Sequence, residues 1–279
     1  MHQRANDIIR RLTRNPLLVE LARRLHVAGL LKSWEYRLRG PRDAVVRHAI
    51  AGVDVLFAAP DATEFRTLEC CYSGELDFVE ALAKNLGQGG VFYDIGSNAG
   101  QFVVLVGKLV GQRGEVMGFE PQANNYGRLA KNIALNQLRN VRVFPIALGD
   151  WDGEIDVFGA RGIATVVPSA ATRHGYKPSS KAKVARGDDL RAAQGLPLPK
   201  AAKIDVEGAE FGVLSGFKDT LSSPICELLC LEVHPDLLPP EVTSEMVFSL
   251  VRSLGFNHAE TRPRAGVIHL IAEKVPRQS

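Results

Sequence analysis

Apolar and polar positions alternate along the middle of the chain with two different spacings. Continuous apolar runs at residues 91–95, 115–119 and 141–145 have the length of buried strands. Between them, residues 101–109 and 124–135 repeat apolar side chains at helical spacing. Alternating strands and helices are typical of a parallel sheet with helices on both faces. The pattern therefore predicts a doubly wound α/β domain.

The same patterns extend this domain in both directions. Further helices are predicted at residues 75–85, 209–217 and 244–254, and further strands at 154–158, 201–205, 225–233, 256–261 and 266–272. The last two strands flank a Pro-containing turn and should pair antiparallel to each other. Residues 161–183 are small and polar, so we expect a loop there that covers the functional site.

The N-terminal part of the chain has a different character. Residues 1–48 hold 11 Lys and Arg against 4 Asp and Glu, a balance of +7 in a chain whose total is +3. Their apolar positions fit two short amphipathic helices, and residues 53–57 predict a small hairpin. We therefore predict a basic helical and hairpin extension, residues 1–70, before a main domain, residues 71–279. The basic segment either packs as a cap with its arginines in water or contacts anionic lipid or an anionic acceptor.

Composition and charge exclude several classes of protein. The apolar fraction of 46% and the charged fraction of 23% are those of a folded globular protein. The longest segment without charge, residues 95–107, is shorter than the ~20 residues of a spanning helix, and arginines interrupt the N-terminal apolar positions, unlike a secretory signal. We expect a cytoplasmic protein, with the basic N-terminus as the candidate for peripheral contact at the inner membrane face. Only Trp34 and Tyr36 accompany the basic residues as stacking groups, so nucleic acid is not an expected partner.

The first candidate site is the turn Gly96-Ser97-Asn98-Ala99-Gly100, which follows Asp94 at the end of a predicted strand. Ligands of doubly wound sheets lie beyond the carboxyl ends of the strands. The two glycines should let the backbone approach a ligand closely. The next strand ends at Glu120, 26 residues after Asp94, where an acid typically binds the hydroxyls of a ribose. These residues predict a nucleoside ligand.

The identity of that nucleoside follows from what the turn lacks. A dinucleotide fingerprint, G-x-G-x-x-G, has a glycine where this chain has Asn98. Asp94, just before the turn, would repel phosphates but suits an ammonium group. S-adenosylmethionine combines an adenosine with a cationic amino acid end and carries no phosphate, so it is the predicted cofactor. A nicotinamide-dependent oxidoreductase, which would share the sheet and Glu120, and a non-catalytic membrane-surface binding protein remain the alternatives.

Charged residues gather at the ends of two later predicted strands. They are Lys203, Asp205, Glu207 and Glu210 in "KIDVEGAE", and Glu232 and His234 in "LEVHP". If the two strands are neighbours, these side chains lie at the same edge as Asp94 and raise one another's pKa, which is a usual way to prepare a base. Taken singly, Glu207 or Glu210 would be an ordinary acid at a helix N-terminus. As a set, they indicate a catalytic centre.

Together these segments resemble a known family. "VFYDIGSNAGQF", "GFEPQANNYGRLAKNIALN", "NVRVFPIALGD", "KIDVEGAEFGVLSGF" and "LEVHP", in this order over roughly residues 72–235, are similar to the FkbM family of S-adenosylmethionine-dependent methyltransferases. The resemblance implies the class I methyltransferase fold, a Rossmann-like seven-stranded sheet with helices on both faces and an antiparallel last pair. Residues 1–70 and 161–183 match the family poorly, and we expect them to select the acceptor.

The resemblance also implies roles for individual residues. The methionine part of the cofactor would be held by Asp94, Gly96, Ser97, Asn98 and Gly100, the ribose by Glu120, and the adenine by Ala147 and Leu148, with Glu75 as a further contact. Asp205 would face the methionine end near the acceptor.

The implied reaction is O-methylation of a hydroxyl on a sugar, glycolipid or polyketide-type acceptor, either small or linked to a glycan or lipid. The activated methyl group requires mainly alignment of the acceptor and removal of its proton. His234 is the favoured general base, with Glu232 or Glu207 orienting it, because an ordinary histidine titrates near neutral pH. A histidine at a strand end can equally serve as a structural hydrogen bonder. Asp205, Glu207 and Glu232 also offer oxygen ligands of the kind that Mg²⁺ accepts, but their spacing does not require a metal and we predict no metal site.

Overall fold

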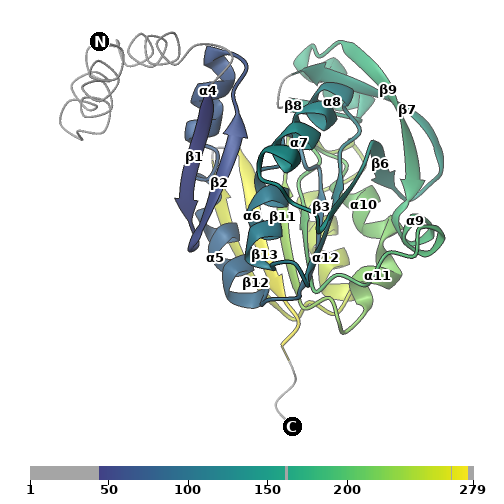
Figure 1. The fold of residues 1–279 in the computed structure, drawn as a ribbon. Coiled ribbons are helices and arrows are strands. Elements are labelled where there is room, and N and C mark those ends of the chain that lie inside the picture. The colour runs from purple at the N-terminus through teal and green to yellow at the C-terminus, as the bar shows by residue number, and fades with distance from the viewer. Residues whose placement is uncertain (1–43, 161–162, 265, 276–279) are drawn as a thin grey trace, which may run out of the picture. The chain divides into compact units, whose positions relative to one another are not determined.

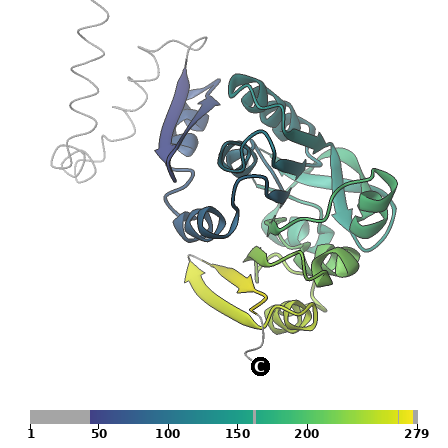
Figure 2. The same ribbon diagram turned by 60° about the horizontal axis from the view of Figure 1, so that its bottom comes forward.

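The computed structural model describes residues 44–160, 163–264 and 266–275, and its two compact units divide after Gly74 (Figures 1 and 2). The amphipathic helices and most of the basic surface predicted for the N-terminal segment lie outside the described residues. Within the described ranges, no helix combines the length and the apolar character needed to cross a membrane.

The first unit is a hairpin covered by one helix. Strands β1 (Val45–Ile50) and β2 (Val53–Ala58) pair antiparallel through the turn Ala51–Gly52, where both residues have positive φ. Helix α4 (Ala62–Glu69) begins at Asp61, whose carboxylate accepts hydrogen bonds from two N–H groups of the first turn. A hairpin with a strand at residues 53–57 is therefore present, but the turn that the sequence suggested at residues 60–63 is wrong, because the chain turns before this strand and begins α4 after it.

The second unit is built on a seven-stranded sheet. Its strands lie in the order β12 (His258–Arg264), β13 (Val267–Glu273), β11 (Leu228–Val233), β10 (Ala201–Ile204), β3 (Val91–Ile95), β4 (Glu115–Phe119) and β5 (Val141–Phe144). The five strands from β11 to β5 are parallel, and β13 runs antiparallel to both β11 and β12. The predicted α/β class and the antiparallel closing pair, yellow in Figure 2, are confirmed.

Helices cover both faces of this sheet (Figure 1). One face carries α5 (Leu76–Asn85), α6 (Gln101–Leu109) and α7 (Ala123–Leu135), and the other carries α9 (Gly187–Ala193), α10 (Glu210–Gly216), α11 (Lys218–Ser222) and α12 (Ser244–Ser253). Because successive side chains of a strand point to opposite faces, a strand covered on both sides must be apolar throughout. In β3, Phe92 and Tyr93 are both fully buried for this reason.

A small second sheet corrects one prediction. Its order is β6 (Ile146–Gly149), β9 (Pro178–Arg186), β7 (Gly153–Ala160) and β8 (Ile163–Thr165), and α8 (Pro168–His174) follows β8. The loop predicted at residues 161–183 is therefore wrong. Pro168 occupies the first turn of α8 and Gly175 ends it in the left-handed conformation, while β9 buries only the small side chains of Ala182 and Val184. Such sparse apolar positions look like a loop in the sequence.

The strand register brings the predicted site residues to one edge. Asp94 of β3 lies opposite Gly118 of β4 on one side and opposite Lys203 of β10 on the other. Ile204 of β10 in turn lies opposite Leu231 of β11. Since these four strands are parallel, the turns that follow them open on the same side of the sheet.

Candidate functional site

The turn after β3 is shaped by close contacts within the protein. Gly96 and Gly100 both have positive φ. A Cβ atom on Gly96 would lie 1.8 Å from the carbonyl oxygen of Asp205, and one on Gly100 would lie 2.5 Å from a methyl carbon of Leu129. We expected these glycines to make room for a ligand. The structure shows that their missing side chains also make room for the neighbouring turn and for α7, while Gly96 lines the pocket described below.

Glu120 ties this turn to the end of β4. Its carboxylate accepts hydrogen bonds from the backbone N–H groups of Asn98 at 2.8 Å and Gln122 at 2.9 Å. Asn98 has φ 49°, which is unusual for a residue other than glycine. Burial raises the pKa of Glu120 to about 7, against the effect of these hydrogen bonds. Ser97 adds a second link, because its hydroxyl donates to the carbonyl of Asp94 and accepts from the N–H of Phe119.

A pocket opens above this turn and extends to the charged residues after β10. Its lining consists of Ile95, Gly96, Asn98, Phe119, Glu120, Pro121, Asn125, Ile146, Ala147, Leu148, Ala164, Val166, Asp205, Val206, Glu207 and Ala209. The sequence singled out seven of these residues: Gly96, Asn98, Glu120, Ala147, Leu148, Asp205 and Glu207. Ala164 and Val166 come from the segment 161–183, which the sequence placed over the site as a loop without naming individual residues.

The other predicted cofactor residues lie outside that lining. Asp94, Ser97 and Gly100 are buried in or below the turn, and Glu75 faces Lys203 instead. Burial is also the main cause that raises the pKa of Asp94 to about 6. Its Oδ1 atom has no hydrogen-bond partner among the described residues. A buried carboxylate oxygen of this kind is a position where a donor from a ligand would be accommodated.

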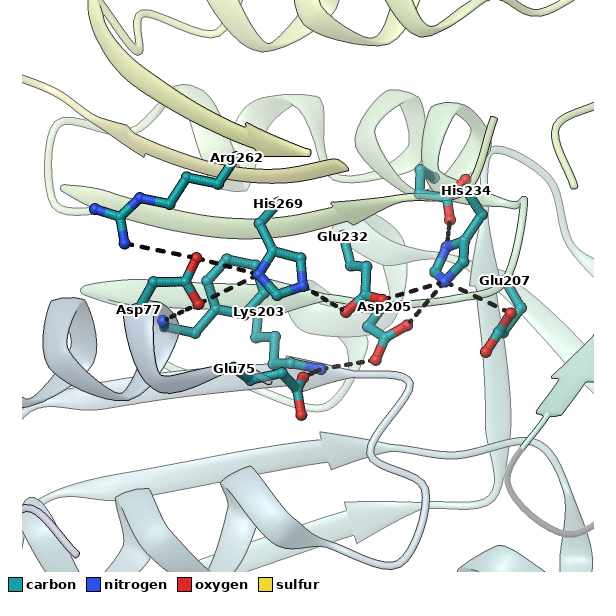
Figure 3. A network of polar contacts seen from close by, with 11 residues as sticks. Glu75, Asp77, Lys203, Asp205, Glu207, Glu232, His234, Arg262 and His269 are labelled. Carbon is teal, nitrogen blue, oxygen red and sulfur yellow. Dashed lines mark hydrogen bonds and ion pairs between the residues drawn. The ribbon is translucent and has the colours of Figure 1, made fainter. Parts of the chain in front are cut away.

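His234 lies among the charged side chains that follow β10 and β11 (Figure 3). Its Nδ1 atom is 2.8 Å from Oε1 of Glu210, a carboxylate with no exposed surface. Its Nε2 atom faces three further carboxylates, with Glu207 at 3.5 Å, Glu232 at 3.6 Å and Asp205 at 3.8 Å. The expected neighbours Glu207 and Glu232 are therefore present, but Glu210 makes the orienting contact.

These carboxylates change the protonation of His234. Burial alone would lower the pKa of the imidazole, but the hydrogen bond to Glu210 and the charge of Asp205 outweigh it and raise the pKa to about 9. The ordinary value near neutrality, on which the choice of His234 as base rested, does not apply. Burial in turn raises the pKa of Glu207 to about 7, against the charge of His234.

Lys203 compensates the acids on the other side of Asp205. Its ammonium is 3% exposed, lies 2.9 Å from Asp205 and 3.6 Å from Glu75, and sits over the ring of Phe102 at 4.8 Å. Burial disfavours this charge, but the neighbouring carboxylates outweigh burial and raise the pKa of Lys203. Lys203 and His234 in turn lower the pKa of Asp205 despite its burial.

The structure adds two residues that the sequence did not suggest. His269 of β13 lies with Nε2 at 3.3 Å from Oε2 of Glu232 and with Nδ1 at 3.1 Å from Oδ2 of Asp77 (Figure 3). Asp77 and His269 are 192 residues apart in the chain, so no local motif could connect them. The one available signal was the strand pairing, in which His269 lies directly opposite Glu232.

Two groups of three side chains have the spacing of a metal site. They are Asp205, Glu207 and His234, and Glu75, Asp205 and Glu232. Each carboxylate in them already has a cation of the chain within 4 Å, either Lys203 or His234. This arrangement is that of an ion-pair network balanced by its own side chains, and it does not require a resident metal.

The sequence of this chain is similar to those of known methyltransferases. The family model for the methyltransferase FkbM domain matches residues 94–257. The curated protein "Hexuronic acid methyltransferase AglP" of Haloferax volcanii is 27% identical over 175 residues, which are 61% of this chain and 66% of that protein.

Among solved structures, the methyltransferase FkbM of Methylobacillus flagellatus aligns with a TM-score of 0.46 and 13% identity over 76% of this chain and 54% of its own. Fibrillarin of Aeropyrum pernix, solved with bound S-adenosylmethionine, aligns with a TM-score of 0.43 and 12% identity over 70% of this chain and 74% of its own.

Proposed function

This chain belongs to the FkbM family of S-adenosylmethionine-dependent methyltransferases, and from that premise we propose that it methylates a hydroxyl oxygen of a sugar-type acceptor. Membership of the family decides between the alternatives that the sequence left open, a nicotinamide-dependent oxidoreductase and a non-catalytic membrane-surface protein. The acceptor and the roles of individual residues are the proposal.

One observation carries it. A single pocket is lined both by Glu120 and the turn after β3, and by Asp205 and Glu207 of the charged group. A methyl transfer needs the cofactor and the acceptor oxygen next to each other in one enclosed space. The shared pocket supports that arrangement.

The cofactor would occupy the part of the pocket near β3 and β4. Glu120 is placed to accept hydrogen bonds from the ribose, and the apolar surface of Ala147 and Leu148 suits an adenine ring. The unpartnered oxygen of Asp94 suits a cationic amino acid end. When bound, S-adenosylmethionine supplies a methyl group that is already activated on a sulfonium. The chain's own task is to position the acceptor and take up its proton.

We propose that the Glu207–His234 pair accepts the proton that the acceptor hydroxyl loses. Glu207 lines the pocket and its pKa of about 7 leaves a substantial part of it ionised at neutral pH. His234, with a pKa of about 9, is mostly protonated there and must lose its proton before it can act as a base. Because the two side chains are 3.5 Å apart, they titrate together and share the proton. The sequence suggested His234 as the base with Glu232 or Glu207 orienting it; we propose instead that Glu207 and His234 act as a pair.

The charge of the site favours a hydroxyl over a carboxylate as the methylated group. Among the described residues, the carboxylates of Glu75, Asp205, Glu207, Glu210 and Glu232 outnumber the cationic side chains beside them, Lys203, His234 and His269. A carboxylate at the methyl-accepting position would be repelled by these acids, whereas the carboxylate of a uronic acid that points away from them would not. The relative AglP is named for a hexuronic acid, which supports a sugar as the acceptor class.

The test uses the purified chain, S-adenosylmethionine with a labelled methyl group, and a panel of oligosaccharides with and without uronic acid. We expect a labelled sugar whose label survives mild alkali, as a methyl ether does. Release of the label as methanol would identify a methyl ester and overturn the hydroxyl assignment. Label found only on acceptors that are not sugars would overturn the acceptor class.

A variant of the pair tests the proton assignment. Glu207→Gln keeps the shape of the side chain and removes its charge, and it should slow turnover by about 10²–10⁴-fold, as removal of a general base does. Binding of S-adenosylhomocysteine by calorimetry should stay within a few-fold of the wild type. Unchanged turnover would exclude Glu207 as a proton acceptor.

A further inference from the structure

We propose that Asp77 and His269 are positioning residues of the methyl-transfer site, which hold Glu232 in place as a carboxylate and through it control proton transfer at the Glu207–His234 pair. This inference rests on the proposed function.

Glu232 lies between two histidines and uses one oxygen for each (Figure 3). Its Oε1 atom is 3.6 Å from Nε2 of His234, and its Oε2 atom is 3.3 Å from Nε2 of His269. On the side of the His269 ring that faces away from Glu232, Nδ1 lies 3.2 and 3.1 Å from the two carboxylate oxygens of Asp77. The side chains therefore form a continuous row from Asp77 to His234.

The end of the row that is remote from the pocket is rigidly built. The ring of His269 is 2% exposed and stacks on Phe78, with centroids 4.4 Å apart. Asp77 is held in the first turn of α5, where its Oδ1 atom also accepts from the N–H of Phe78, and Arg262 of β12 lies 3.9 Å from its Oδ2 atom. Three separate elements, α5, β12 and β13, thus converge to fix one imidazole against Glu232.

The contacts of His269 determine where its protons sit. Asp77 accepts at Nδ1, so Nδ1 carries a proton. A neutral ring would then present a bare nitrogen lone pair to the Glu232 carboxylate, which is repulsive. A proton at Nε2 removes the repulsion, and Asp77 and Glu232 together outweigh burial and raise the pKa of His269. The positions of Asp77 and Glu232 on either side of the ring and the direction of this shift both favour the protonated form of His269.

The charged groups around the two histidines form one network. Beyond the direct contacts, the charge of His269 also acts on Glu75 and Asp205, which Lys203 links at 3.6 and 2.9 Å. His234 faces Glu210 of α10, Asp205 and Glu207 of the turn after β10, and Glu232 of β11; His269 faces Asp77 of α5 and Glu232, with Arg262 behind Asp77. Loss of the His269 cation leaves the group more negative, which makes every remaining site bind its proton more tightly. The pair at the pocket should then release its proton only at higher pH.

The experiment follows the imidazole of His234 by NMR in protein labelled at histidine, with the signal assigned by its loss in His234→Gln. His269→Gln should move the titration midpoint of His234 upward by about one pH unit, as expected for loss of a nearby cation. The rising limb of the pH profile of kcat should move in the same direction, while the affinity for S-adenosylhomocysteine stays the same. His258→Gln, which removes an exposed imidazole from β12, is the matched control and should move neither.

Two further variants separate charge from packing. Asp77→Asn removes the opposite charge and should move the His234 midpoint downward or leave it in place. The double variant Asp77→Asn/His269→Gln restores the net charge of the network. It should therefore cancel most of the upward shift and return the His234 midpoint close to that of the wild type, although both contacts are lost. Equal shifts in all three variants, or none in His269→Gln, would overturn the inference. The NMR result does not depend on turnover, so a failure of the proposed reaction would leave it readable.

Discussion

The turns after β3 and after β10 face the same pocket but are held in place by different means. Each contains a non-glycine residue with positive φ, Asn98 at 49° in the first and Glu207 at 52° in the second. In the first turn, one carboxylate from Glu120 accepts two backbone N–H groups. In the second, several carboxylates share the imidazole of His234.

This difference has consequences for how the two turns respond to change. In the first turn, the N–H groups of Asn98 and Gln122 have one carboxylate, that of Glu120, as their acceptor, and the side-chain link of Ser97 does not replace it. Charges in the second turn redistribute when one acid is removed, because several carboxylates compensate one another. We therefore expect a single substitution to disrupt the structure of the first turn. In the second turn, we expect a single substitution to change the protonation of the remaining groups.

The largest effect is expected in the first turn. Glu120→Ala leaves the N–H groups of Asn98 and Gln122 without their acceptor, at about 1–3 kcal/mol each, and it removes the proposed ribose contact. Affinity for S-adenosylhomocysteine, measured by calorimetry, should fall by at least about 10²-fold. Glu115→Ala, at the exposed start of the same strand, is the control. An affinity within threefold of the wild type would show that Glu120 does not hold the turn.

A smaller, pH-dependent effect is expected in the second turn. His234 in the folded chain has a pKa of about 9, above its ordinary value of 6.5. Its protonation therefore stabilises the fold fully below pH 6.5, and this stabilisation is lost as the pH rises through 9. The free energy of unfolding, measured by denaturant titration, should fall by up to about 3 kcal/mol over this window.

His234→Gln should make that pH dependence much weaker, whatever its effect on stability at a single pH. His258→Gln should keep the slope of the wild type. A variant of His234 that loses stability with pH as steeply as the wild type would show that another group titrates there.

The smallest effect is expected on removal of metal ions. Lys203 and His234 already balance the acids of both candidate groups, so a strong chelator should change the rate of methyl transfer by less than about twofold. The rate should be measured before and after dialysis against the chelator. Loss of activity that is restored by Mg²⁺ would show that these carboxylates hold a metal.

The sequence predicts those parts of the two turns that depend on neighbouring residues in the chain. The strands at residues 91–95 and 115–119 and the helix at 101–109 were predicted with the bounds that the structure has, because continuous apolar runs and glycine turns mark them. The edge that gathers Asp94, Glu120 and Asp205 follows from parallel topology alone.

What the sequence could not predict depends on contacts between distant segments. Asp77 and His269 meet only because α5 and β13 pack on the same strand, β11. The raised pKa of His234 arises mainly from the hydrogen bond to Glu210 and the charge of Asp205, which reach the imidazole from α10 and from the turn after β10. Strand β9 escaped detection because its buried side chains, Ala182 and Val184, are too small and too few to give an apolar run.

The two turns are packed so closely that no side chain fits at position 96, because its Cβ atom would overlap the carbonyl oxygen of Asp205. Any residue with a side chain at position 96 would push the backbone of the second turn away, and the hydrogen bond from the N–H of Asp205 to the carbonyl of Ile95 at 2.9 Å keeps the two turns together. Chimaeras that join residues 94–120 of this chain to the later half of a relative should therefore work only when both parents have glycine at this position and the same spacing between the turns. The range of the proposed acceptor is therefore better altered at Ala164 and Val166, which line the pocket from β8 and the segment after it and do not take part in this contact.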